Sequence, residues 1–452
     1  MRFTNALLLA SVAWLGMEST GCNPGDFNSV LDQAPVVSFG TSGSSTGALS
    51  VLALPPPAEA NAKVAARMLV SRTDQQYLAV ADYDKDGKVA LHEVTDATAL
   101  ANLGTGNQGI VQSAARLSDG SIVLGTPHFS ASSNVAIGRI SILTLTTQAD
   151  GSLAFGIQPG ATGTDHFGMA VATGDVTGQN AGLAAETVVV ADDSVSLIEA
   201  DGTIVQTQCP EVALTNPNLP SSYAYRPVAV GDLLAGGGDE IALGGQTSGQ
   251  GAGMVVFLQF DSTGTLVCSP NGNVLQSPGP SISNNFGTSL AVGDYNGDGA
   301  LDLAVGTPPD TVYVYFGPLD GVTDPSVTIT SAAASTDFGR RVATFLVPGF
   351  ATAQLLVSAP TAAGGQGRVM LFDVSNGASA VPSTAAVTTL FDSNQGSNFG
   401  GSNIGGLAFN TATCQPGGAT QLVPWVSTNT DVLTFFAYPN GSADPRCFAQ
   451  KK

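Results

Sequence analysis

The chain has 452 residues, of which 55 are glycine and only 11% are charged, a composition that disfavours long helices and coiled coils. Thirty-five Asp and Glu against 15 Lys and Arg give a formal charge of −20, which disfavours nucleic acids and anionic lipid surfaces as partners. Such an acidic surface suits divalent cations, basic partners or solubility alone.

The N-terminal segment is expected to direct export. One basic residue, Arg2, precedes the apolar run 6–15, which is too short to span a bilayer and is typical of a signal peptide over residues 1–21. The tetrapeptide Ser-Thr-Gly-Cys at 19–22 resembles a bacterial lipobox, although the family usually has a larger apolar residue in place of the serine. We therefore expect lipidation of Cys22 and a lipid anchor at the outer membrane or cell surface, with secretion as the alternative.

Four further cysteines permit two disulfide bonds in an exported chain. Sequence order suggests Cys209 with Cys268 and Cys414 with Cys447, and three connectivities are open. The spacings are too wide for a CxxC zinc site.

The rest of the chain divides by its pattern. Residues 22–47 are polar and rich in Gly and Ser, which predicts a flexible tether after the lipidated cysteine. Residues 48–54 could be a strand, and from about residue 62 short apolar strands alternate with Gly, Asp, Asn and Ser. We assign 48–445 to one repeat-built domain and 446–452 to a C-terminal tail.

The repeat is visible in two motifs. Residues 167–175 align without gaps on residues 286–294, since both begin with Phe-Gly and end with Gly-Asp. A second motif follows at a similar distance, as Gly-Thr-Pro at 125–127 and 306–308 and as Ser-Ala-Pro at 358–360. Self-similarity at a period of about 50–60 residues indicates propeller blades or solenoid units rather than independent domains.

These motifs resemble the FG-GAP repeat of integrin alpha subunits. That resemblance implies an all-β, seven-bladed β-propeller, with six or eight blades as alternatives. The units are expected at residues 62–104, 105–160, 165–206, 222–268, 285–330, 337–392 and 398–440. Ring closure is expected to borrow residues 48–54 as a strand of the last blade, because closing the ring removes unpaired sheet edges.

The strongest local signal lies at 294–302. Oxygen-bearing side chains recur at alternate positions and a glycine permits a sharp turn, an arrangement that suits Ca²⁺. The expected ligands are Asp294, Asn296, Asp298, the carbonyl of Ala300, and Asp302. The loop is similar to the calcium loop of FG-GAP repeats at the positions of Asp294, Asn296, Asp298 and Asp302. The alternative is an acidic hairpin turn without metal.

A second loop has the spacing of an EF-hand but lacks its helices. Its candidate calcium ligands are Asp82, Asp84, Asp86, Lys88 and Glu93. Because the flanking segments are strand-like, the alternative is a solvated Asp-Gly hairpin within a blade.

Enzyme motifs are scarce. His92, His128 and His166 stand singly, without HExxH spacing, and no GxSxG nucleophile elbow is recognisable. We expect no catalytic residues and a non-catalytic surface lipoprotein that binds a protein or glycan partner. The rival is an enzyme acting on polysaccharide or phospholipid through propeller loops, because related repeats accompany such enzymes.

Overall fold

The structure is a computed structural model of the chain. It describes residues 36–38, 49–55, 64–72, 75–84, 89–130, 137–148, 152–163, 166–178, 186–191, 194–199, 204–207, 227–235, 238–246, 253–260, 265–268, 273–278, 285–331, 336–345, 352–377, 380–382, 385–386, 388–391, 400–401, 404–410, 420–427 and 432–435.

The described strands form seven sheets, which we number as blades in chain order. Blade 1 comprises β2 (Leu49–Leu54), β3 (Val64–Arg72), β4 (Leu78–Asp84) and β5 (Val89–Glu93). Blade 2 comprises β6 (Ser113–Arg116), β7 (Ile122–Thr126), β8 (Arg139–Thr147) and β9 (Leu153–Thr162). Blade 3 comprises β10 (Ala170–Gly174), β11 (Glu186–Val190), β12 (Val195–Ile198) and β13 (Ile204–Thr207). Blade 4 comprises β14 (Val228–Gly231), β15 (Glu240–Gln246), β16 (Gly253–Phe260), β17 (Leu266–Cys268) and β18 (Val274–Gln276).

Blade 5 contains β19 (Ser289–Gly293), β20 (Asp302–Thr307), β21 (Thr311–Tyr315) and β22 (Val327–Thr330), with β26 (Ala380–Pro382) added in parallel to β22. Blade 6 contains β23 (Val342–Phe345), β24 (Gln354–Ala359), β25 (Arg368–Phe372) and β27 (Thr388–Phe391). Blade 7 joins β28 (Ile404–Asn410), β29 (Thr420–Ser427) and β30 (Val432–Phe435) to β1 (Val36–Ser38).

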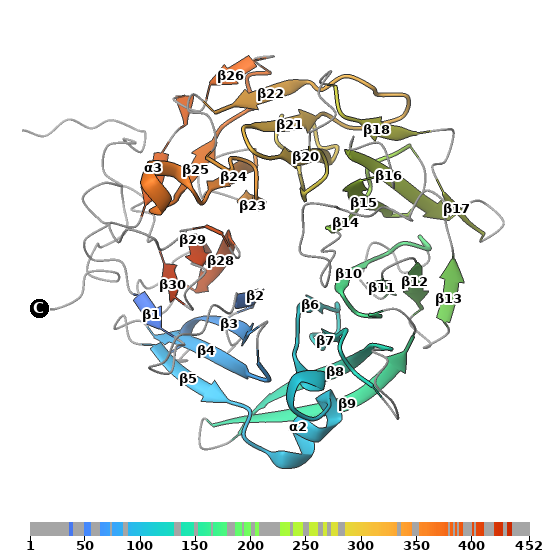
Figure 1. Ribbon diagram of the computed structural model, residues 1–452, viewed down its shortest axis with the longest axis vertical. Helices are drawn as coiled ribbons and strands as arrows, with labels where there is room; N and C mark the ends of the chain where they lie inside the picture. The colour runs from blue at the N-terminus through green and yellow to red at the C-terminus, as the bar shows by residue number, and fades with distance from the viewer. Residues whose placement is uncertain are drawn as a thin grey trace, which may run out of the picture.

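The sheets stand round a ring, as Figure 1 shows. The first strand of each blade contacts the first strand of both neighbours, and this chain of contacts closes through β28 and β2. The predicted all-β propeller is therefore confirmed.

Ring closure differs from the expectation. Residues 49–54 form β2, the innermost strand of blade 1, and do not complete blade 7. The closing strand is instead β1, which pairs antiparallel with β30 and comes from the segment expected to be a tether. Blade 1 consequently begins at β2 rather than near residue 62.

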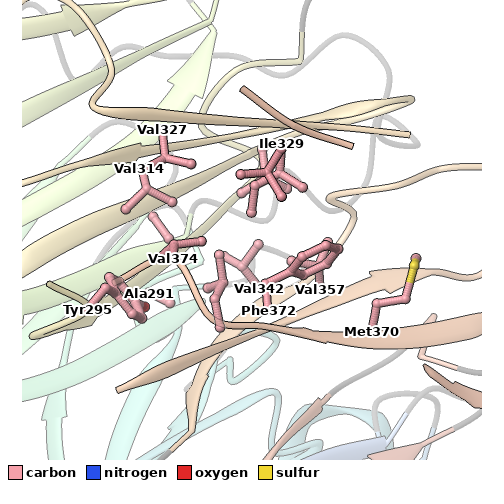
Figure 2. Close-up of a cluster of buried hydrophobic side chains, with 14 of the residues drawn as sticks. Ala291, Tyr295, Val314, Val327, Ile329, Val342, Val357, Met370, Phe372 and Val374 are labelled. Carbon is pink, nitrogen blue, oxygen red and sulfur yellow. The ribbon is translucent and has the colours of Figure 1, made fainter. Parts of the chain in front are cut away.

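The hydrophobic core lies between adjacent sheets. Figure 2 shows one such layer, in which Val314 and Ile329 of blade 5 face Val342 and Phe372 of blade 6. All four side chains are buried. Each blade thus buries its faces against its neighbours, which a single four-stranded sheet cannot do alone.

The two repeat motifs meet at the contact between blades. Phe338 is fully buried, and the carbonyl of the following Gly339 lies where a Cβ on Gly306 of the preceding blade would be. Ser289 donates a hydrogen bond to the same carbonyl over 3.0 Å. Equivalent close approaches join Gly125 to Gly168 and Gly244 to Gly287. The motifs recur because each forms half of an inter-blade contact that admits no side chain.

Short helices occupy two connections and were not expected from the repeat pattern. Helix α2 (Ala97–Leu103) leads into the 3₁₀ turn η3 (Gly106–Gly109), and α3 (Ala362–Gly365) is a single irregular turn. Asp96 caps α2 by accepting a hydrogen bond from the Ala99 amide over 2.8 Å. Leu103 is fully buried against blades 1 and 2, so α2 extends their shared core.

Candidate functional site

The acidic loop at 294–302 connects β19 to β20, the first two strands of blade 5. Gly293 and Asp302 are paired across these strands, so the loop begins and ends at one point. Gly297 and Gly299 have φ values of 83° and 89°, in the left-handed region that glycine adopts readily. The chain can therefore wrap tightly, as the sequence predicts.

The oxygen-bearing side chains of this loop accept hydrogen bonds from its own backbone. Asp294 accepts from the amides of Gly297 over 2.6 Å and Gly299 over 3.1 Å. Asn296 accepts from the amide of Asp298 over 2.9 Å, and Asp298 from that of Ala300 over 2.8 Å. These Asx-type bonds hold the oxygens in a compact, solvent-facing group. In the part of the chain that the structure describes, no three His, Cys, Asp or Glu side chains group as a metal site.

Asp302 has a different environment from the other acids. Its carboxylate is fully buried and accepts three backbone hydrogen bonds, from Tyr295 over 2.7 Å, Asn296 over 3.2 Å and Gly317 over 2.9 Å. Burial raises its pKa to about 6, although the three amides oppose that shift. Asp302 therefore fixes the entry and exit of the loop from inside the blade.

The same position carries a buried carboxylate in two other blades. Glu186 pairs with Gly174, and Glu240 pairs with Gly231, as Asp302 pairs with Gly293. Glu240 accepts from the amides of Leu233 and Leu234, both over 2.8 Å, and from the side-chain amide of Gln259 over 2.7 Å. Because these loops lack the alternating oxygens, the buried acid acts as a clamp on the turn independently of metal.

The loop at 82–93 is not assembled as an EF-hand. Asp82 lies within β4, the third strand of blade 1, and the loop is flanked by strands β4 and β5. The Asp82 carboxylate is buried and accepts two hydrogen bonds from Arg67, over 2.6 and 2.7 Å. Glu93 accepts a 3.2 Å hydrogen bond from Tyr77 and pairs with Ala79, whereas Asp82 pairs with Ala90.

Asp82 and Glu93 therefore lie three residues apart along the hairpin, about 10 Å. The structure does not bring these two candidate ligands together. The side chains of Asp84, Asp86 and Lys88 lie outside the described residues.

The structure also reveals a pair of histidines that was not predicted from the sequence. His128 and His166 are far apart in the chain, yet their rings meet edge to face with centroids 5.7 Å apart. No spacing rule links them, because they belong to different connections of the ring. His92 stands apart from this pair, with its Nε2 3.5 Å from Asp82 Oδ2.

Of the cysteines, only Cys268 lies among the described residues. It ends β17 and is disulfide-bonded. Cys22, Cys209, Cys414 and Cys447 lie outside that part of the chain, so the expected pairing stays a prediction. Among the helices that the structure describes, none combines the length and apolar character of a membrane span.

Comparison with known proteins supports the repeat. A family model described as "FG-GAP repeat" matches residues 286–316, which include the whole acidic loop. This match confirms the resemblance that the motifs suggested, and it falls on the unit with the most complete motif.

The curated relatives match over a short region. Phosphatidylinositol-glycan-specific phospholipase D from Mus musculus is 36% identical over 95 residues, which are 19% of this chain and 11% of that enzyme. The Homo sapiens protein is 36% identical over 94 residues, with 18% and 11% covered. The chain thus spans about a tenth of the length of these relatives.

Solved structures with a similar shape are distant. Sqt1 of Saccharomyces cerevisiae has a TM-score of 0.47 at 11% identity, over 83% of this chain and 82% of that chain. BBS1N in complex with ARL6DN has a TM-score of 0.45 at 12% identity, over 87% and 93%. The propeller is defined by its strand pairing and by the closed ring of contacts between blades.

Proposed function

We propose that this protein is a non-catalytic, exported lipoprotein whose calcium-stabilised propeller binds a protein or glycan partner. The closed ring supports this proposal, because it is a rigid scaffold that presents loops from several blades on one face. The observation that carries it is the compact oxygen-rich loop at 294–302 within an FG-GAP repeat.

The donor set of this loop fits a hard cation. Asp294, Asn296 and Asp298 supply side-chain oxygens on the exposed side, and Ala300 adds its carbonyl at the end of the turn. Oxygen donors of this kind are the ligands that Ca²⁺ prefers. Asp302 already accepts three amide hydrogen bonds, so we assign it chiefly to holding the loop. Bound calcium would supply positive charge there and order the loop.

Calcium binding is tested by thermal unfolding of the mature chain with millimolar Ca²⁺ and with chelator. A ligand that binds only the folded form at about 100 times its Kd stabilises it by about 2.7 kcal/mol. We expect a higher Tm with calcium in the wild type and no shift in the double variant Asp294→Ala/Asp298→Ala. Asp232→Ala, in the loop of blade 4 without alternating oxygens, is the matched control and should keep the shift. An equal shift in all three proteins would contradict the assignment.

The partner is expected at the face opposite the acidic loop, as the resemblance to integrin heads implies. A protein or glycan suits a strongly acidic chain better than a nucleic acid does. Binding of the mature chain to glycan arrays and to immobilised surface proteins, with and without Ca²⁺, tests this role. If the chain showed no calcium-sensitive binding to either the glycan arrays or the immobilised proteins, the partner-binding role would be contradicted.

Lipid anchoring rests on the N-terminal pattern ending at Cys22. Expression in a bacterial host with labelled fatty acid should label the wild type and partition it with membranes. Cys22→Ser should lose the label and appear in the soluble fraction. A wild type without label would favour simple secretion.

A second candidate is a phospholipid-acting enzyme, which the short match to phosphatidylinositol-glycan-specific phospholipase D favours. The mature chain can be assayed on glycosylphosphatidylinositol and on common phospholipids. Turnover that follows the protein through purification would replace the binding role with a catalytic one.

A further inference from the structure

Three polar side chains gather at one end of blade 2. His128 lies two residues after β7, His166 lies in the connection from β9 to β10, and Gln112 directly precedes β6. The rings of His128 and His166 have centroids 5.7 Å apart, and Gln112 Nε2 lies 3.0 Å from His128 Nε2. Three connections of the ring thus contribute one side chain each to a single small site.

The backbone holds this site in place. The bridge between Gly138 and Phe167 joins the β7–β8 loop to the connection that carries His166. Phe167 donates to the Ile137 carbonyl over 3.3 Å, and Met169 donates to the His166 carbonyl over 3.1 Å. The site lies where β7 ends, whereas the acidic loops of the blades lie where the second strands begin. It is therefore at the opposite end of the blades from the proposed calcium loop.

The repeat itself shows that the fold does not require histidine at these places. At the junction of blades 5 and 6, Pro309 stands in the position of His128 and Asp337 in that of His166. Asp337 and His166 share a left-handed backbone, with φ values of 57° and 59°. Asp, Asn and His all adopt this conformation more readily than other non-glycine residues. The backbone thus explains a polar residue at 166, but it does not explain a second imidazole beside it.

We propose that His128 and His166 bind a divalent transition-metal ion such as Zn²⁺ at the junction of blades 2 and 3. Imidazole nitrogen is a preferred ligand for zinc, and Zn–N bonds of about 2.0–2.1 Å place the centroids of two rings on one ion about 5 Å apart. The observed 5.7 Å is close to that spacing, so rotation of one ring from its edge-to-face orientation brings a nitrogen of each to the ion. The Gln112 amide can present its oxygen beside the same rings after a flip.

The electrostatic setting agrees with this chemistry. Burial and the neighbouring His166 lower the pKa of His128, which keeps the ring in the neutral form that a metal requires. Two protein nitrogens leave coordination positions for water or for a group from a partner. Such a site differs from the calcium loop in ligand chemistry and in place, and it can exist whether or not that loop binds calcium.

The test is titration of the full mature chain with ZnCl₂ by calorimetry, and with Co²⁺ by visible absorption. The protein carries an affinity tag without histidine, its free thiols are alkylated, and saturating Ca²⁺ is present. We expect one zinc per chain, with weaker binding at acidic pH because protons compete with the metal for the imidazole nitrogens.

The repeat supplies conservative variants. His166→Asn and His128→Thr place residues there that the chain uses at matching positions, Asn285 before Phe286 and Thr361 after Pro360. Each should weaken zinc binding at least about tenfold without changing the metal-free Tm. His92→Ala is the matched control, because it removes the only other histidine of the chain. Wild type without stoichiometric zinc, or equal zinc affinity in all four proteins, would overturn the proposal.

Discussion

The buried carboxylate of Glu240 offers a sharp test of how the blades respond to pH. Its side chain is fully buried and receives two backbone hydrogen bonds and one from Gln259. These three donors favour the ionised form, but burial outweighs them and raises the pKa from 4.5 to about 7. The neighbouring Asp232 acts in the same direction.

The sign of the effect follows from proton binding. Between pH 4.5 and 7 the folded chain keeps the Glu240 proton while the unfolded chain has lost it, so the free energy of unfolding falls as pH rises. Each pKa unit corresponds to about 1.4 kcal/mol, which gives about 3 kcal/mol over the whole interval. This contribution is fully present below pH 4.5 and lost above pH 7.

The perturbation is Glu240→Gln. Glutamine keeps an oxygen for the amides of Leu233 and Leu234, and the Gln259 amide can flip to accept from the new nitrogen. The assay is urea unfolding followed by circular dichroism at pH 5, 6, 7 and 8 for both proteins. Subtracting the variant from the wild type cancels the other titrating groups, such as Glu186 and Asp302. We expect the difference to fall by about 2.5 kcal/mol from pH 5 to pH 8, slightly less than over the whole interval because the first measurement lies above pH 4.5.

A difference that stays flat would show that the Glu240 pKa is not raised. A pKa that the hydrogen bonds depress below 4.5 would give the same flat difference above pH 5, because the group would then titrate at lower pH. A flat difference would therefore refute the reasoning.

Three further predictions concern stability and are measured by chemical or thermal unfolding. Arg67→Ala should lower the free energy of unfolding by about 3–5 kcal/mol, because it leaves the Asp82 carboxylate buried without the Arg67 guanidinium. The double variant Arg67→Leu/Asp82→Leu should lower it by less than Arg67→Ala does, because no unpaired charge is left buried. Gly306→Ala should cost about 1–3 kcal/mol, because its Cβ would overlap the Gly339 carbonyl at the junction of blades 5 and 6. Asp96→Ala should cost about 1 kcal/mol by removing the N-cap of α2.

Each of these variants has an internal comparison. Gly321→Ala changes a glycine with no neighbouring atom in the way of a Cβ, so its cost should reflect only its positive φ. Asp96→Asn keeps a capping oxygen and should restore most of the stability lost in Asp96→Ala. If Gly306→Ala and Gly321→Ala lost equal stability, overlap between the blades would not be the cause of the loss in Gly306→Ala.

The misplacement of blade 1 shows where local sequence is ambiguous. Residues 78–83 read like the first-strand motif at 289–295, since both are apolar strands followed by Asp-Tyr. The structure places residues 78–83 in the third strand, because β2 and β3 precede them in the same sheet. A strand with alternating apolar residues that is followed by a turn has the same sequence pattern whether it is the first or the third strand of a blade. Only its pairing partners decide which strand of the blade it is.

The polar positions show the same limit. The alternating oxygens at 294–302 were readable because every member of that loop is close in sequence. The clamp by Glu186 and Glu240 was not readable, because it depends on which strand residue faces the turn. The His128–His166 pair depends on the junction between two blades.

The all-β class, the repeat and the propeller could be predicted from the amino-acid sequence, since the Phe-Gly and Gly-Thr-Pro motifs form the contacts that join one blade to the next. The sequence also determined the composition and place of the acidic loop. Tertiary structure alone decided that β1 closes the ring, that Arg67 occupies the Asp82 carboxylate, and that two distant histidines meet. The physical reason is that local spacing specifies turns and strand faces, whereas the partner of a strand edge or a buried charge is chosen by the packing of the whole ring.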